Sequence, residues 1–123
     1  MPREVHWVAR HDGDAVVWVD MAKFEQAWSG VAAQYVGKGG RGPTSDSFSK
    51  YRKFGQWFAA TARPVEMAEV FLNGGFPEFS NGRHRVAWLR DHGLRAFPLA
   101  TNPDLAAEFT ERFGTAIRSS VLL

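Results

Sequence analysis

The chain has 123 residues, a formal net charge of +2 at pH 7, 45% hydrophobic residues and no cysteine. These values indicate one folded domain and exclude a disordered tail, a coiled coil, a disulfide scaffold and a cysteine-ligated zinc site. No run approaches the ~18 apolar residues that cross a membrane, and the charged start MPREVHW differs from a signal peptide. We therefore expect a cytoplasmic protein with no membrane insertion.

The first part of the chain predicts a hairpin and a short helix. Segments 5–9 and 15–19 are apolar and rich in strand-favouring residues, and the tetrapeptide His-Asp-Gly-Asp at 11–14 is typical of a turn. Asp20 is a suitable N-cap for a helix over 21–28. We therefore expect the fold to open with an N-terminal hairpin that leads directly into a helix.

A glycine-rich segment and an aromatic helix come next. Segment 37–49 contains four glycines and one proline, so we expect a flexible loop there. It lacks the closing Gly-Lys-Ser or Gly-Lys-Thr of a nucleotide-binding P-loop. Segment 49–60 predicts a helix because Tyr51, Phe54 and Phe58 recur three and four residues apart. Such an aromatic stripe is more often part of the core than a surface for stacking bases.

Strands and helices alternate through the second half of the chain. The expected elements are a strand over 65–72 with an interruption near Ala68, a short strand over 76–79, a helix over 83–92, a strand over 96–100 and a last helix capped by Thr101 or Asn102. Together these elements predict a single α+β domain over residues 1–123. It would contain a small mixed sheet, the N-terminal hairpin and about four helices.

Positive charge is concentrated in two blocks of the sequence. Residues 37–63 carry six Lys or Arg against one acidic residue, and residues 81–95 carry four against one, whereas the other segments are acidic. Such blocks are often solvated loops and helix faces, but they also suit a phosphate-bearing partner, either a nucleotide or a nucleic acid. The candidate nucleic-acid surface consists of Lys50, Arg52, Lys53 and Arg90.

The junction after the strand at 76–79 carries the most specific signal. A helix begins there with three consecutive side-chain donors, Arg83, His84 and Arg85. Cations at a helix start are unfavourable, by ~0.3–1 kcal/mol each, unless an anion binds to the free N–H groups of the first turn. A preceding glycine lets a phosphate approach the backbone. The candidate phosphate or nucleotide site is therefore Asn81, Gly82, Arg83, His84 and Arg85.

Structural alternatives to this site remain open. Asn-Gly is also a strong hairpin signal, and the arginines of the turn could simply pair with glutamates on a neighbouring strand. The glutamates concerned are Glu66, Glu69 and Glu78, which are also candidate metal ligands, although solvated or paired carboxylates are more common. The spacings of the four histidines match no metal-ligand motif, so the metal stays unknown.

The run NGRHRVAWL at 81–89, followed by a glycine and AFPL at 96–99, resembles the ParB/sulfiredoxin-like fold. In that superfamily a G-x-H-R or G-x-x-R turn binds nucleotide phosphates, which implies this role for Gly82, His84 and Arg85. The longer run FSNGRHRVAWLRDHGLRAFP resembles the plasmid fertility inhibition factors, which block conjugative transfer of other plasmids or of T-DNA. The resemblance thus implies an inhibitor of conjugative DNA transfer that binds a nucleotide or DNA.

The resemblance also implies a nuclease or nucleotide-hydrolysing activity as a candidate function, with Mg²⁺ and ATP or another NTP as candidate cofactors. His84 would then be the general acid or base, because histidine titrates near neutral pH. Tyr51, Phe54 and Trp57 would belong to the family core. Arg83 stands where a sulfiredoxin has its cysteine, which excludes that chemistry. The length leaves no room for the helix-turn-helix domain of a full ParB, so we do not expect operator binding.

A second class of function remains open at this point. The chain could be a non-enzymatic inhibitor that binds a protein component of the conjugative transfer machinery. Exposed aromatic residues such as Trp7, Trp18 or Trp88 would then mark the interface, because tryptophan is enriched at binding hot spots. Binding of nucleotides or DNA is the property that separates the two classes.

Overall fold

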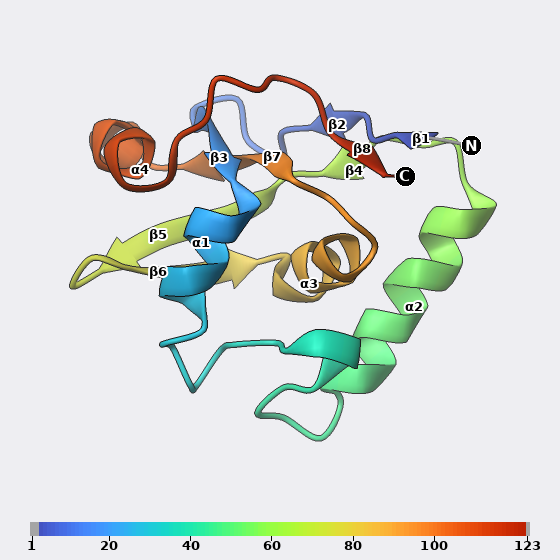
Figure 1. The fold of residues 1–123 in the computed structure, drawn as a ribbon. Coiled ribbons are helices and arrows are strands. Elements are labelled where there is room, and N and C mark those ends of the chain that lie inside the picture. The colour runs from blue at the N-terminus through green and yellow to red at the C-terminus, as the bar shows by residue number, and fades with distance from the viewer. Residues whose placement is uncertain (1–2, 123) are drawn as a thin grey trace.

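The computed structural model describes residues 3–122, which form an α+β fold (Figure 1). The helices of this part are α1 (Met21–Trp28), η1 (Lys38–Gly40), α2 (Ser47–Ala60), α3 (Arg83–Asp91), η2 (Pro103–Leu105) and α4 (Ala106–Phe113). The strands are β1 (Arg3–Glu4), β2 (Trp7–Val8), β3 (Ala15–Asp20), β4 (Val65–Glu66), β5 (Ala68–Asn73), β6 (Phe76–Asn81), β7 (Ala96–Thr101) and β8 (Val121–Leu122). Within residues 3–122, every helix is too short or too polar to span a membrane.

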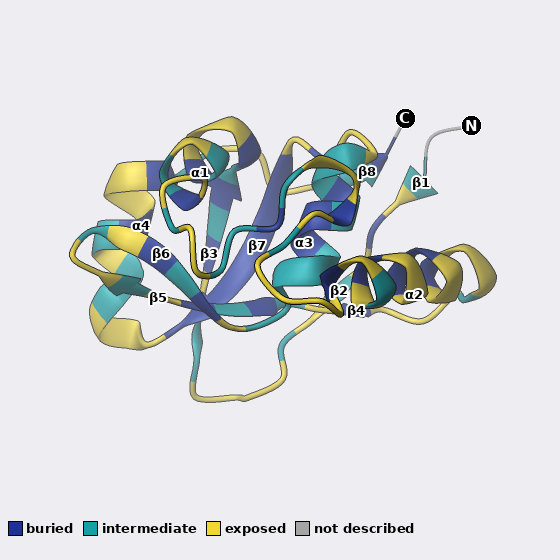
Figure 2. Cartoon of the chain, turned by 90° about the horizontal axis from the view of Figure 1, so that it is seen from below, coloured by how far each residue is buried: buried dark blue, intermediate teal, exposed yellow. Residues whose placement is uncertain are grey.

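A mixed four-stranded sheet forms the centre of the fold, which confirms the predicted mixed sheet. Its strand order is β3-β7-β5-β6. Strand β7 is antiparallel to β3 and parallel to β5, and β6 is antiparallel to β5. All six residues of β7 are buried, and Figure 2 shows this strand dark along its whole length. The parallel pair forms because the chain passes through α3 between β6 and β7 before it returns beside β5.

The predicted N-terminal hairpin is wrong. Strand β2 pairs in parallel with β4, with Trp7 opposite Val65, whereas β3 pairs with β7. The chain does turn between β2 and β3, where the Asp14 N–H donates to the His11 carbonyl at 3.4 Å. A local turn reverses the chain without deciding which strands pair, and here the pairing is decided by segments far away in sequence. Strand β1 likewise pairs with β8 near the other end of the chain.

Helix α2 begins two residues earlier than predicted and packs against α3. The aromatic residues of the predicted stripe are buried: Tyr51, Phe54 and Phe58. Gly55 allows the close approach, because a Cβ at this position would clash with Nε1 of Trp88 on α3. Trp57 is 39% exposed, so its predicted place in the core is wrong.

The glycine-rich segment is anchored on these two helices by its first half. The Gly39 N–H donates to Oδ2 of Asp91 at 2.9 Å, and Gly40 is buried against the ring of Tyr51. Gly37 and Arg41 form a β-bridge across η1. The segment is therefore held in place here, while the flexibility expected of residues 37–49 as a whole stays a prediction.

The predicted interruption near Ala68 is confirmed. The segment predicted as one strand over 65–72 is divided at Met67 into β4 and β5. The pairing of β5 with β6 shifts register between Glu69 and Val70. Before the break, β4 lies outside the four-stranded sheet and pairs with β2. This divergence places β4 opposite α2 across the start of α3, where the candidate site lies.

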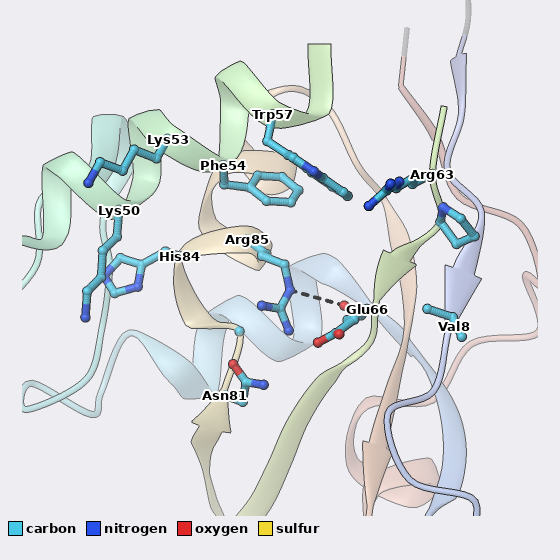
Figure 3. A pocket seen from close by; sticks show the side chains of 12 residues that line it. Val8, Lys50, Lys53, Phe54, Trp57, Arg63, Glu66, Asn81, His84 and Arg85 are labelled. Atoms are coloured by element: carbon cyan, nitrogen blue, oxygen red, sulfur yellow. Dashed lines mark hydrogen bonds between the residues drawn. The ribbon is translucent and has the colours of Figure 1, made fainter. Parts of the chain in front are cut away.

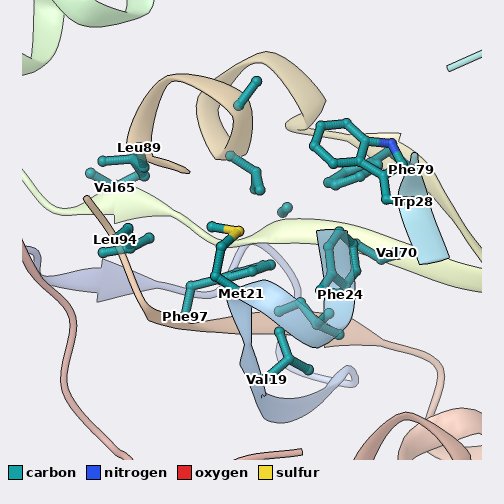
Figure 4. Close-up of a cluster of buried hydrophobic side chains, with 14 of the residues drawn as sticks. Val19, Met21, Phe24, Trp28, Val65, Val70, Phe79, Leu89, Leu94 and Phe97 are labelled. Atoms are coloured by element: carbon teal, nitrogen blue, oxygen red, sulfur yellow. The ribbon is translucent and has the colours of Figure 1, made fainter. Parts of the chain in front are cut away.

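The core is centred on Phe24 of α1 (Figure 4). Its ring contacts the rings of Trp28, Phe79, Phe97 and Phe113, with centroids 5.3–6.0 Å apart. These contacts join α1 to β6, β7 and α4. Burial of each such side chain stabilises the fold by ~1.5–3 kcal/mol, so this cluster holds the sheet and two helices together.

Strand β6 forms one edge of the sheet and is covered by a side chain. Nε2 of Gln34 donates to the Phe79 carbonyl at 2.9 Å, and the Phe79 N–H donates to Oε1 of Gln34 at 2.6 Å. The amide of Gln34 therefore satisfies both outward backbone groups of this residue. Pro77, two residues earlier in the strand, has no N–H to satisfy.

Candidate phosphate-binding site

The start of α3 requires glycine. Gly82 has a φ of +95° and precedes the helix, which begins without a side-chain cap. A Cβ at this position would lie 2.9 Å from Cβ of Ala68 and 2.8 Å from Nη2 of Arg85. The carbonyl of Gly82 accepts from the Val86 N–H at 3.1 Å, which closes the first turn. The backbone thus turns tightly into a helix whose first N–H groups have no side-chain acceptor.

Arg85 is fixed at this turn and keeps one nitrogen free. Its Nε donates to the carbonyl of Glu66 at 3.1 Å, as Figure 3 shows. Its Nη2 is buried and has no hydrogen-bond partner among the described residues. Burial lowers the pKa of Arg85, and the carboxylates of Glu66 and Glu69 oppose this shift. Because a guanidinium stays protonated, the site retains a positive charge with an unused donor.

A hollow of about 730 Å³ lies between α2, β4 and the start of α3 (Figure 3). Its basic side chains are Lys50, Lys53, Arg63 and Arg85. Its apolar wall consists of Val8, Phe54, Trp57 and Pro64. Its other lining residues are Glu66, Asn81, Gly82 and His84. This volume is within the range of sites that hold small ligands, and the lining combines positive charge with an aromatic surface.

Arg83 does not share this hollow with Arg85. Its Nη1 donates to the carbonyl of Gln34 at 3.3 Å, and its side chain lines a second hollow of about 410 Å³. The two hollows adjoin, and the residues that line both are Lys50, Asn81, Gly82 and His84. The five residues of the predicted site are therefore adjacent, but its two arginines lie on opposite sides of the turn.

His84 lies between these arginines and is half-buried. Its burial, and next the charges of Arg83 and Lys50, lower its pKa to about 4. Its Nε2 is a buried atom that makes no hydrogen bond within the described part of the chain. This shift favours the neutral imidazole at pH 7, which makes His84 a weak proton acceptor there.

The predicted nucleic-acid role of Arg90 is wrong. Its side chain is 11% exposed, and it donates to Oε2 of Glu25 at 3.1 Å and to Oδ1 of Asp91 at 2.9 Å. Asp91 also accepts from Tyr51 and from the Gly39 N–H. Burial acts to raise the pKa of Asp91, but these hydrogen bonds hold it below its usual value. Arg90 thus belongs to an internal network that joins α1, η1, α2 and α3.

The other predicted basic residues are on α2, and two of the three face the hollow. Lys50 and Lys53 line it, whereas Arg52 is exposed and lies outside the lining of either hollow. Figure 3 shows Lys50 beside His84, at the end of the hollow away from Trp57 and Arg63. Positive charge from α2 and from α3 therefore meets across the same space.

The three candidate glutamates do not converge. Glu66 lines the hollow, Oε1 of Glu69 lies 3.1 Å from Nε2 of His11, and Glu78 accepts from Asn73 at 3.0 Å. Between residues 3 and 122, no three Asp, Glu or His side chains cluster as metal ligands. The predicted pairing of the two arginines with these carboxylates is not observed in this part either, because Arg85 reaches a carbonyl instead.

The tryptophans chosen from the sequence are partly buried, and a different one is exposed. Trp7, Trp18 and Trp88 have intermediate exposure, whereas Trp57 is exposed and lines the hollow. Arg63 is a second lining residue that sequence reasoning missed. The available signal was the position of Trp57, directly before Phe58 and therefore beside the buried stripe, together with the basic residue that follows the helix.

Known proteins share both the sequence pattern and the fold of this chain. The family model described as plasmid fertility inhibition factor matches residues 16–114. Among solved structures, the chain is similar to the oncogenic suppression activity protein, a plasmid fertility inhibition factor studied as a gold(I) cyanide derivative. The TM-score is 0.67 at 22% identity, over 92% of this chain and 62% of that one, so the likeness shows a shared fold. No curated protein matches the sequence.

Proposed function

The chain belongs to the plasmid fertility inhibition factor family, and on this basis we propose that it inhibits conjugative DNA transfer by binding phosphate groups at the start of α3. The phosphate belongs to a nucleotide or to a DNA backbone. One observation carries the proposal: four basic side chains and an uncapped helix start face one hollow. Helix starts and guanidinium groups are the usual binders of phosphate oxygens.

Arg85 supports an anionic ligand in particular. A buried donor without a partner costs about 1–3 kcal/mol, and Nη2 of Arg85 is such a donor within the described residues. Arg85 lines the hollow, so a small rotation of its guanidinium would let a phosphate oxygen accept from Nη2 and recover that cost. The same oxygen would also favour the three other cations of the hollow, since their mutual repulsion decreases when an anion binds.

The ParB/sulfiredoxin-like fold is part of the proposal. The order expected of that fold is a strand, a G-x-H-R turn, a helix, a glycine and a short apolar strand. The chain has this order in β6, residues 82–85, α3, Gly93 and β7. Gly93 has a φ of +96° directly after the helix, as a glycine that ends a helix should.

Hydrolysis of a phosphodiester or of an NTP such as ATP is the finer part of the proposal. The basic side chains would stabilise the charge that develops on the phosphate, and neutral His84 would accept a proton. Glu66 contributes the only carboxylate to the lining of this hollow in the described part of the chain. Mg²⁺ is commonly held by one or two carboxylates together with substrate phosphates, so Glu66 and the ligand would hold it jointly.

Titration tests the phosphate site. We would add ATP, short single-stranded DNA and duplex DNA to the wild-type protein and to Arg85→Ala, at two salt concentrations, with and without Mg²⁺. We expect affinity that weakens with salt and falls about 10- to 100-fold in Arg85→Ala, because a charge-assisted hydrogen bond is lost. Arg95→Ala is the matched control, because Arg95 is exposed and lies outside both hollows.

Two outcomes of these titrations would contradict the phosphate site. If neither nucleotide nor DNA binds, and the protein still inhibits transfer in cells, the inhibitor acts through protein contacts with the transfer machinery. Equal loss of affinity in Arg85→Ala and Arg95→Ala would reduce the site to a general charge effect. Turnover of ATP or DNA that requires Mg²⁺ and is lost in Arg85→Ala would support hydrolysis.

A further inference from the structure

Binding of phosphate does not account for the exposed indole of Trp57 in the hollow. Trp57 is 39% exposed, although the other aromatic residues that α2 turns toward α3 are buried. Phosphate oxygens require donors and positive charge, and an indole face supplies neither. Large exposed aromatic surface in a concave site usually contacts a ligand.

The surroundings hold the indole in place along the wall. The Phe54 ring packs beside it, with the centroids 5.8 Å apart and the planes 39° from parallel. Figure 3 shows Trp57 extending from α2 toward Arg63, above the space that Arg85 enters from α3. The apolar and the phosphate-binding parts of the hollow are therefore adjacent, and one ligand of moderate size can contact both.

Glu66 adds an independent indication of the ligand's chemistry. Its carboxylate lies in the same hollow as the four cations, and Figure 3 shows it near the Arg85 guanidinium. When no metal ion lies between them, a negative side chain repels a ligand that is only phosphate. It favours a ligand that also presents N–H or O–H donors, as nucleobases and sugars do.

We propose that Trp57 stacks a nucleobase, so that the ligand is a nucleotide unit with an unpaired base whose phosphate lies at the start of α3. The unit is either a free nucleotide or part of a single strand of DNA. This inference rests on the proposed phosphate site. Duplex DNA is excluded as the ligand of the stacking position, because both faces of its bases are covered by neighbouring bases.

Substitutions on one helix test the stacking. Trp57→Ala should weaken binding of ATP or of a single-stranded oligonucleotide about 5- to 150-fold, and Trp57→Phe should retain most of the affinity. Phe48→Ala is the matched control, because Phe48 is an aromatic residue of α2 that is 58% exposed and lies outside both hollows. The dissociation constants would be measured by calorimetry, after urea unfolding has shown that each variant is folded.

Ligands without a base complete the test. Tripolyphosphate and an abasic oligonucleotide should bind more weakly than their base-containing counterparts, and Trp57→Ala should leave their affinity unchanged. Loss confined to ATP identifies a free nucleotide as the ligand, and loss confined to the oligonucleotide identifies a single strand.

Two results would overturn the inference without affecting the phosphate site. The first is Trp57→Ala that binds every ligand as the wild type does, while Arg85→Ala does not. The second is a duplex whose affinity depends on Trp57 as strongly as that of a single strand. If Arg85→Ala also leaves all binding unchanged, the proposed function fails together with the inference.

Discussion

Both ends of α3 carry an arginine, but the two arginines have different partners. At the C-terminal end, Arg90 is enclosed and paired with Glu25 and Asp91. At the N-terminal end, Arg85 reaches one carbonyl and keeps a buried nitrogen without an acceptor within the described residues. Nη2 of Arg90 is also a buried atom without an acceptor in this part of the chain, so the two ends differ in their carboxylates. Arg90 pairs with two of them, and Arg85 pairs with none among the described residues.

This difference separates structural from functional charge. A cation whose partners are supplied by the same chain contributes to stability, since removal of it leaves buried carboxylates without a partner. A cation that lacks an internal carboxylate contributes less to stability, and under the proposed function Arg85 serves a ligand instead. Position along the helix agrees with this division, because a cation is favourable near the C-terminal end of a helix and costly near the N-terminal end.

Removal of Arg90 gives the largest expected effect. Arg90→Ala should lower the free energy of unfolding by about 3 kcal/mol, because the partly buried carboxylates of Glu25 and Asp91 would lose their cation while they keep their other hydrogen bonds. Urea unfolding measures this change, and Arg95→Ala should differ from the wild type by less than about 0.5 kcal/mol. The folded fraction of Arg90→Ala should still bind phosphate ligands. A variant with unchanged stability but lost binding would mean that the two ends do not differ in kind.

The next largest effect is expected from substitution of the two glycines that flank α3. Gly82→Ala should cost about 2–3 kcal/mol of stability, because the new Cβ would meet Ala68 and Arg85 in addition to the strain of a positive φ. Gly93 has nearly the same φ, +96°, but a Cβ added there would meet no atom within 4 Å, so Gly93→Ala should cost only about 1 kcal/mol. Thermal or urea unfolding of both variants measures the difference. Equal costs would show that the start of α3 is not sterically closed.

Acidification gives the smallest effect, and the part of it above about pH 5 reports on His84 at the N-terminal end, because the carboxylates titrate at lower pH. Unfolded histidine binds a proton near pH 6.5, whereas folded His84 does so only at about pH 4. Between these values the unfolded state holds more protons, so the stability that is present at neutral pH decreases as the pH falls. We expect a loss of about 1 kcal/mol, because half of the side chain remains near solvent. His84→Gln should reduce this slope in urea unfolding, and an identical slope would remove His84 as its cause.

Local elements of this fold were predictable because their signals are local. The α3 helix follows from its periodicity and from the glycines at its ends, and the break near Ala68 follows from a failed alternation. The pairing of the strands was not predictable, since β2 pairs with β4 rather than with β3, the next strand in sequence. The side chain of Trp7 shows the reason: its Nε1 donates to Ser120, which is 113 residues away.

The candidate site was predicted in composition but not in orientation. The residues from Asn81 to Arg85 do lie at a hollow, yet Arg83 and Arg85 face opposite sides of the turn. Arg90 was assigned to the surface because its partner Glu25 is 65 residues earlier in the sequence. The resemblance placed Trp57 in the core, but Trp57 precedes buried Phe58 by one residue, and that rotation around the helix leaves it exposed.

The side-chain amide of Gln34 covers part of the β6 edge, which limits how another protein can bind to this sheet. An edge strand with free backbone groups invites a strand from another chain, which leads to aggregation or to binding by sheet extension. Gln34 occupies that position at Phe79, and on the opposite edge Val19 of β3 is bridged by Gly114. A strand from another chain would therefore have to displace Gln34 or Gly114 before it could pair with the sheet at these two residues.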